Sequence, residues 1–101
     1  MLFKEYTYSV LIASSSEKFA QNLLPLLPEN EFGPVETVKT TGEARRKLIN
    51  QTFDIILVNT PLSDEFGTKF ALDVSADTKS GILMFVKSDL YEEITDKVID
   101  Y

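Results

Sequence analysis

The chain has 101 residues, 44% of them hydrophobic and 26% charged, which is the composition of one globular domain with its own core rather than of a disordered segment. A net charge of -6 disfavours direct contact with nucleic acid or with an anionic membrane surface. The absence of cysteine and histidine excludes disulfides, thiolate metal sites and a histidine general base.

The first predicted strand is YSVLIA, residues 8–13, a short and nearly continuous apolar run. A helix is predicted over residues 14–27, where apolar residues recur at helical spacing. Ser14 precedes Glu17 by three residues, the spacing of a capping box, so we expect Ser14 to cap this helix. Pro25 should kink or shorten the helix because proline lacks a backbone N–H.

The alternation of strand and helix then continues. PVETV, residues 34–38, is a brief alternating strand, and Thr40 and Glu43 have capping spacing before a helix that extends to Ile49. Four basic residues lie along this stretch and either contact an acidic partner or solvate an exposed helix face: Lys39, Arg45, Arg46 and Lys47.

The most strand-like segment is FDIILV, residues 53–58. A short helix is predicted over residues 67–77, a buried strand over 81–86 and an amphipathic helix over 88–101. The last helix has an apolar stripe that belongs either to the core or to an interaction face, formed by Leu90, Ile94, Val98 and Tyr101.

This order of elements indicates β-α-β units and a parallel sheet covered by helices on both faces. We therefore predict an α/β fold of three layers with a doubly wound parallel sheet. In such open sheets the functional crevice lies at the carboxyl ends of the strands. The segments of interest are those that follow each strand, namely residues 13–16, 38–41, 59–63 and 86–89.

Residues 8–101 resemble the receiver domain of two-component response regulators, which has a flavodoxin-like fold with strand order 2-1-3-4-5. In that family a buried third strand ends on a phospho-accepting aspartate, followed by a loop with Leu-Pro and later Gly. The stretch DIILVNTPLSDEFG matches in its aliphatic run, in Leu62 and in Gly67, and it has Asn59 at the acceptor position. Ser63 stands where proline is usual.

Three features depart from the chemistry of that family. Asn59 lacks the ionised oxygen that forms an acyl phosphate. Ser14 and Ser15 occupy the positions of the acidic pair that holds magnesium, and they carry no carboxylate. Val86 occupies the position of the switch hydroxyl. The resemblance and these losses together predict a degenerate pseudo-receiver that is not an enzyme and has no metal site and no cofactor.

The polar residues at the strand ends have both structural and ligand-binding interpretations. Asn59 either caps the turn that follows its strand or contacts a ligand directly. The segment SSSEK, residues 14–18, either caps a helix or holds an anion, as flavodoxins hold FMN. Asp64 and Glu65 are two carboxylates in one loop, which alone make a weak cation site.

A receiver normally continues with a fifth strand that carries a lysine and with a fifth helix, and this sequence ends at Tyr101. We therefore predict strand order 2-1-3-4, with the fourth strand as an exposed edge that invites another chain. The expected consequence is an edge-to-edge or swapped dimer, or a protein partner, at the fourth strand and the helix after it. The resemblance also implies an output domain beyond Tyr101.

No run in the sequence approaches the length of a membrane span, and the first ten residues lack the apolar segment of a signal peptide. We expect a cytoplasmic, non-enzymatic signalling module that controls an output domain in transcription or antitermination through protein–protein interaction or dimerisation. The alternative is a small flavodoxin-like module that binds phosphate or FMN through residues 14–16 and Asn59.

Overall fold

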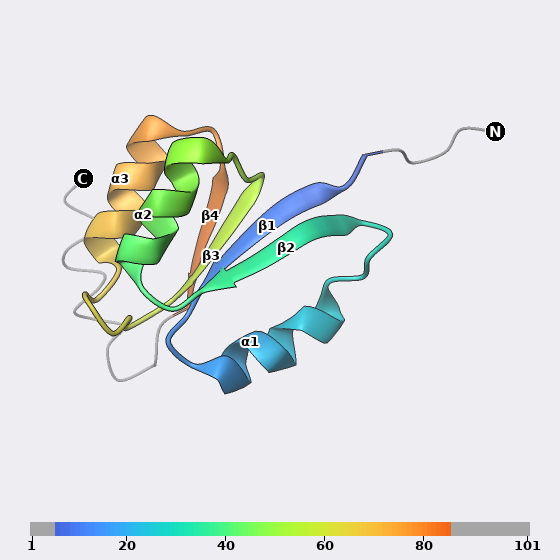
Figure 1. The fold of residues 1–101 in the computed structure, drawn as a ribbon, viewed down its shortest axis with the longest axis horizontal. Helices are drawn as coiled ribbons and strands as arrows, with labels where there is room; N and C mark the ends of the chain where they lie inside the picture. The colour runs from blue at the N-terminus through green and yellow to red at the C-terminus, as the bar shows by residue number, and fades with distance from the viewer. Residues whose placement is uncertain (1–5, 86–101) are drawn as a thin grey trace.

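The computed structural model describes residues 6–85 (Figure 1). Within them, β1 (Tyr8–Ala13), β2 (Phe32–Val38), β3 (Ile55–Asn59) and β4 (Gly81–Phe85) form one parallel sheet in the order β2-β1-β3-β4. They alternate with α1 (Glu17–Leu23), the 3-10 helix η1 (Leu24–Leu26), α2 (Thr41–Asn50) and α3 (Thr68–Asp77). The predicted strand order 2-1-3-4 is confirmed. No helix in this part of the chain is long and apolar enough to cross a membrane.

Helices cover both faces of the sheet, so the prediction of three layers is confirmed (Figure 1). Leu11 and Ile56 point to the face that packs against Phe70 of α3. Their neighbours Ile12 and Leu57 point to the opposite face, which α1 covers. Successive side chains of a strand alternate between faces, and both faces are buried, which explains the nearly continuous apolar runs in the sequence.

The helix after β1 begins later than predicted. Ser16 is its N-cap, and the Ser16 hydroxyl accepts a hydrogen bond from the backbone N–H of Phe19 at 3.2 Å. The prediction that Ser14 caps this helix is therefore wrong. Pro25 lies in η1, where the α-helix has already given way to a tighter turn, so the predicted shortening is confirmed.

The strands differ from prediction at their ends. β2 begins at Phe32 rather than at residue 34, because an edge strand tolerates Pro34, which has no N–H to donate. β3 begins at Ile55 and includes Asn59 as its last residue. Val86 and the predicted helix over 88–101, with its apolar stripe, lie outside the described residues.

The amino-terminal end of α2 is tied to the loop between β3 and α3. The Thr40 hydroxyl accepts from the backbone N–H of Glu43 at 3.0 Å, as the capping pattern predicted. The Asp64 carboxylate accepts from the backbone N–H groups of Thr41 and Gly42, both at 3.0 Å, and from the Thr41 hydroxyl at 2.8 Å. Asp64 therefore satisfies donors that have no partner inside the helix and places a negative charge at the positive end of its dipole.

The first testable prediction concerns Asp64→Asn, which removes this charge at constant size. Hydrogen bonds, the backbone bond from Thr41 first among them, lower the pKa of Asp64 from 3.8 to about 2. A carboxyl whose pKa is lower in the folded chain stabilises the fold fully above its unfolded pKa and loses this effect as the pH falls. We expect the variant to be less stable at neutral pH and to show a flatter loss of stability between pH 3.8 and about 2.

Urea unfolding across this pH range measures the effect, with Glu29→Gln as a control because Glu29 is an exposed carboxylate in the loop before β2. Equal pH dependence in Asp64→Asn and in the wild type would contradict the prediction.

The second prediction concerns Gly67, the N-cap residue of α3, which has φ 117°. A Cβ atom there would lie 3.2 Å from Thr60 Cγ2 and 3.3 Å from Val58 Cγ1. Gly67→Ala should cost about 2 kcal/mol of unfolding free energy because the backbone is left-handed and the space is occupied. Gly42→Ala in α2 is the matched control, since its Cβ would make ordinary contacts of 3.7 Å with Arg46 and Asp64 and the variant should gain about 0.5 kcal/mol. The prediction would be contradicted if Gly67→Ala lowered the unfolding free energy by less than about 0.5 kcal/mol.

Candidate functional site

Asn59 and Ser14 meet at the carboxyl end of the sheet. Ser14 directly follows β1, and Asn59 is the last residue of β3. β1 and β3 are neighbours in parallel register, with Ala13 opposite Val58, so the residues that follow each of these lie close together. The Asn59 amide nitrogen Nδ2 donates a hydrogen bond to the Ser14 hydroxyl at 3.1 Å.

The Ser14 hydroxyl has its hydrogen-bonding capacity filled by the chain itself. It accepts from the backbone N–H of Ser16 at 3.0 Å and from Asn59, and it donates to the Ser16 carbonyl at 3.1 Å. A hydroxyl supplies one donor and two acceptor lone pairs, and all three are in use. Ser14 is also buried. It is therefore a structural connector between the loop after β1 and the end of β3.

Ser15 behaves differently from Ser14. Its side chain is exposed, and its hydroxyl lies 3.4 Å from the Pro61 carbonyl in the loop after β3, at the long limit of a hydrogen bond. The two positions predicted as equivalents of the acidic pair thus take separate roles. Ser14 is fixed beneath the surface, and Ser15 remains accessible to solvent.

Asn59 is half-buried, and its side chain bonds to Ser14 rather than to a backbone group of its own turn. Its amide oxygen makes no hydrogen bond to any other residue that the structure describes, so this oxygen can accept a bond from a ligand. The neighbouring Thr60 is buried, and both its N–H and its hydroxyl donate to the Phe85 carbonyl, at 2.9 and 2.8 Å. Sequence reasoning missed this link between the ends of β3 and β4.

The two loop carboxylates have separate partners. The Asp64 carboxylate accepts hydrogen bonds from the amino-terminal end of α2. Glu65 Oε1 lies 3.8 Å from the Arg45 guanidinium. Among the residues described, the structure forms no cluster of three side chains that could hold a metal ion. No local sequence pattern indicates the bond between Asp64 and Thr41, because the two residues are 23 positions apart.

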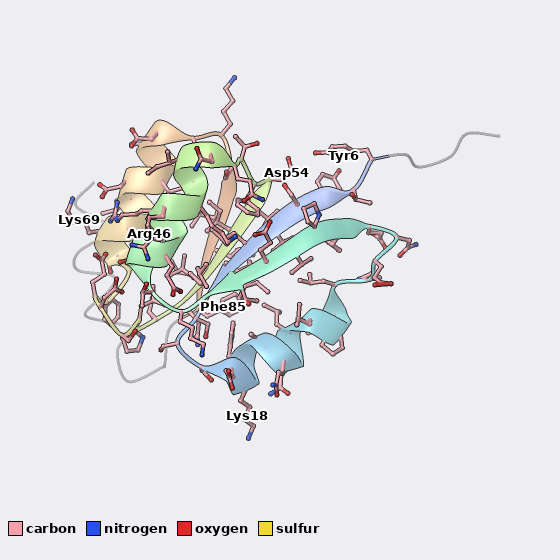
Figure 2. All side chains as sticks on the ribbon, in the orientation of Figure 1. Tyr6, Lys18, Arg46, Asp54, Lys69 and Phe85 are labelled. Atoms are coloured by element: carbon pink, nitrogen blue, oxygen red, sulfur yellow. The ribbon has the colours of Figure 1, made fainter. Side chains whose placement is uncertain are left out.

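The basic residues around α2 are largely engaged within the chain, which supports their interpretation as parts of a solvated helix surface. Arg46 is the exception, since within residues 6–85 no ion pair involves it, and Figure 2 shows it on α2. The ion pairs of the others are Lys39 with Glu17 at 3.4 Å, Arg45 with Asp73 at 3.1 Å, and Lys47 with Glu36.

β4 presents an apolar surface on the α1 side of the sheet. Ile82 and Met84 pack against the core beneath α2 and α3, whereas the intervening Leu83 is 57% exposed and Phe85 is 36% exposed. The Phe85 ring meets the Phe19 ring of α1 edge to face, with centroids 5.1 Å apart, and Figure 2 places Phe85 between the sheet and α1. In the described part of the chain, β4 pairs on one side, with β3.

Comparison with models of protein families and with curated proteins gave no match. Among solved structures, the chain is similar to the MaeR response regulator bound to beryllium trifluoride, with a TM-score of 0.73 and 18% identity over 94% of this chain and 83% of that one. A mutant MaeR response regulator bound to sulfate gives a TM-score of 0.74 and 18% identity over 95% of this chain and 84% of that one.

A third similar structure is a fusion to a trimeric coiled-coil segment of yeast Spc42, with a TM-score of 0.74 and 20% identity. The match covers 92% of this chain and 64% of the fusion, so the chain spans less than two thirds of that protein. At such low identities the likeness concerns the fold. The chain therefore has the fold of response-regulator receiver domains, with a parallel sheet in the order 2-1-3-4.

Proposed function

We propose that this chain is a cytoplasmic receiver-like module that is not phosphorylated and that signals by binding another protein chain. The observation that carries the proposal is the hydrogen bond of 3.1 Å from the Asn59 amide to the Ser14 hydroxyl. It joins the residue at the acceptor position to one of the two residues at the acidic-pair positions. Neither residue carries a charge, and each is the other's partner.

The chemistry of phosphoryl transfer explains why this pair supports the proposal. An aspartate accepts a phosphoryl group when its ionised oxygen attacks phosphorus and the leaving group departs. The neutral amide of Asn59 offers no such nucleophile. Magnesium needs several oxygen ligands, preferably carboxylates, and the Ser14 hydroxyl is already filled by bonds within the chain. The loss of the switch hydroxyl at Val86 remains an inference from the sequence.

The third testable prediction is that acetyl phosphate with magnesium leaves the intact mass of the chain unchanged. We expect no phosphorylated species in the wild type, and none in Asn59→Asp either, because Ser14 and Ser15 would still supply no carboxylate for the metal. A phosphorylatable receiver domain treated in parallel is the control for the reagent. A phosphorylated wild type would overturn the proposal, and a phosphorylated Asn59→Asp variant would show that the metal site is retained.

Thermal melting with FMN, phosphate and nucleotides distinguishes the proposed signalling role from the alternative, a module that binds phosphate or FMN. A ligand present at 100 times its dissociation constant would add about 2.7 kcal/mol to the unfolding free energy. Our proposal predicts unchanged melting with each ligand, and a rise with FMN would favour the alternative.

We propose further that the partner is a second copy of this chain, paired along β4. Among the strands that the structure describes, the two outer ones differ, and β4 is better suited to strand addition than β2. β2 contains Pro34, and its pairing with β1 is irregular between Tyr8 and Val10, features that discourage strand addition. β4 contains five uncharged residues without proline, and its apolar Leu83 and Phe85 are exposed. An uncharged strand also places no like charges directly opposite one another at such a contact.

The fourth testable prediction is that Leu83→Lys weakens self-association by about tenfold or more, because it places two like charges near the contact. Light scattering over a range of chain concentrations measures the dimer. Leu26→Lys is the matched control, since Leu26 is 71% exposed on η1 and lies off this surface. A wild-type chain that remains monomeric at every concentration would overturn the second copy as partner.

Control of an attached output domain, in transcription or antitermination, is the biological role that we propose for such pairing. It rests on analogy with the receiver fold.

A further inference from the structure

A groove runs between α2 and α3 at the end of the sheet opposite Asn59. It consists of two adjoining hollows of about 280 and 470 Å³, which share Leu48, Asp77 and Thr78. The second hollow reaches the residues that precede β3 and β4, and α2 and α3 end beside it (Figure 1). We call this feature the α2–α3 groove, defined by Leu48, Ile49, Val74, Asp77 and Thr78.

The α2–α3 groove has an apolar floor and one prominent apolar wall. Val74 is buried, and Leu48 packs against the core. Ile49, on the last turn of α2, is 78% exposed, the largest exposed fraction among the large hydrophobic side chains described. An apolar side chain placed over Leu48 would also remove Ile49 from water. Burial of apolar surface is the usual driving force for docking at such a surface.

The charges around the groove favour a positively charged occupant. The carbonyl ends of α2 and α3 both carry the partial negative charge of a helix terminus. α3 has no basic residue in its last turn, and Asp77 stands there instead, with the wrong sign for the helix dipole. Among residues 6–85 no hydrogen bond or ion pair involves the Asp77 side chain.

The other charged groups near the groove are compensated or lie at its rim. Asp73 is paired with Arg45 at 3.1 Å and with Lys69 at 3.2 Å. Asp54 accepts hydrogen bonds from the N–H and the hydroxyl of Ser9. Lys79 lines the second hollow and is exposed. Asp77 is therefore the carboxylate in this set that a cation from outside would neutralise.

We infer that the α2–α3 groove docks a short segment of a partner protein in which apolar residues stand beside lysine or arginine. The apolar side chains cover Leu48 and Ile49. The cation lies beside Asp77 and the last carbonyl groups of α2 and α3, where it relieves the mismatch of charge at the end of α3. This surface is separate from both β4 and the Asn59 site, so it adds a second contact to the proposed module.

Fluorescence anisotropy of the full 101-residue chain with a labelled synthetic peptide of repeating Leu-Lys-Lys-Leu units tests the inference at about 0.15 M salt. We expect Ile49→Asp and Asp77→Lys each to weaken binding by about tenfold or more. The matched controls are Leu26→Asp and Glu29→Lys, which make the same changes of charge at exposed positions outside the groove. They should leave the affinity within about twofold.

Asp77→Lys also separates a binding role from a structural one. Lysine suits the end of α3 better than aspartate, so the melting temperature of the free chain should stay the same or rise while binding falls. A lowered melting temperature together with weakened binding would overturn a direct role for Asp77 in binding.

Three further outcomes would overturn the inference. Equal weakening by the controls would show general attraction to an acidic chain, and equal binding of a peptide with serine in place of leucine would show that the apolar contact contributes nothing. Loss of self-association in Ile49→Asp, measured by light scattering, would show that a second copy occupies the groove.

Discussion

The arrangement of this molecule depends on the burial of β1 between two parallel neighbours and two helical layers. Val10, Leu11, Ile12 and Ala13 are all completely buried, and β1 pairs with β2 on one side and β3 on the other. This burial fixes the register of β1 against β3, because a shift of one residue would turn each side chain to the opposite face. The same register brings Ser14 to Asn59, so the polar contact at the sheet end follows from packing below it.

The polar groups at the carboxyl end of the sheet mostly satisfy one another. Ser14 is filled by Ser16 and Asn59, and Thr60 is bound to the Phe85 carbonyl. Of the two acids in the loop after β3, Asp64 bonds to the start of α2 and Glu65 lies near Arg45. In a working phosphotransfer site, carboxylates are left available to a metal and a phosphoryl group. At this end of the sheet Ser14, Thr60 and Asp64 bond to other groups of the chain, where they stabilise the fold.

The sequence predicted the sheet and its two covered faces because apolar periodicity is a strong local signal. Prediction failed where neighbouring residues compete for one role, as at a helix cap, and where a hydrogen-bond partner is distant along the chain. Ser14 has the capping spacing, but it is buried at the end of β1, where its hydroxyl bonds to Asn59 and to the Ser16 backbone, and Ser16 caps the helix instead. The bond from Asp64 to α2 joins residues distant along the chain, and no local pattern encodes it. The strand predicted from Pro34 begins at Phe32 instead, because an edge strand accommodates Gly33 and Pro34.

Phe85 joins three parts of the molecule at one point. Its ring touches Phe19 of α1, and its carbonyl receives both hydrogen bonds from Thr60, the residue after Asn59. A displacement of Phe85 would therefore disturb its contacts with both α1 and the loop beside Asn59. A chain bound at the β4 surface would therefore meet a strand whose end is tied to the loop beside Asn59, and any energetic coupling between the two places would be reciprocal.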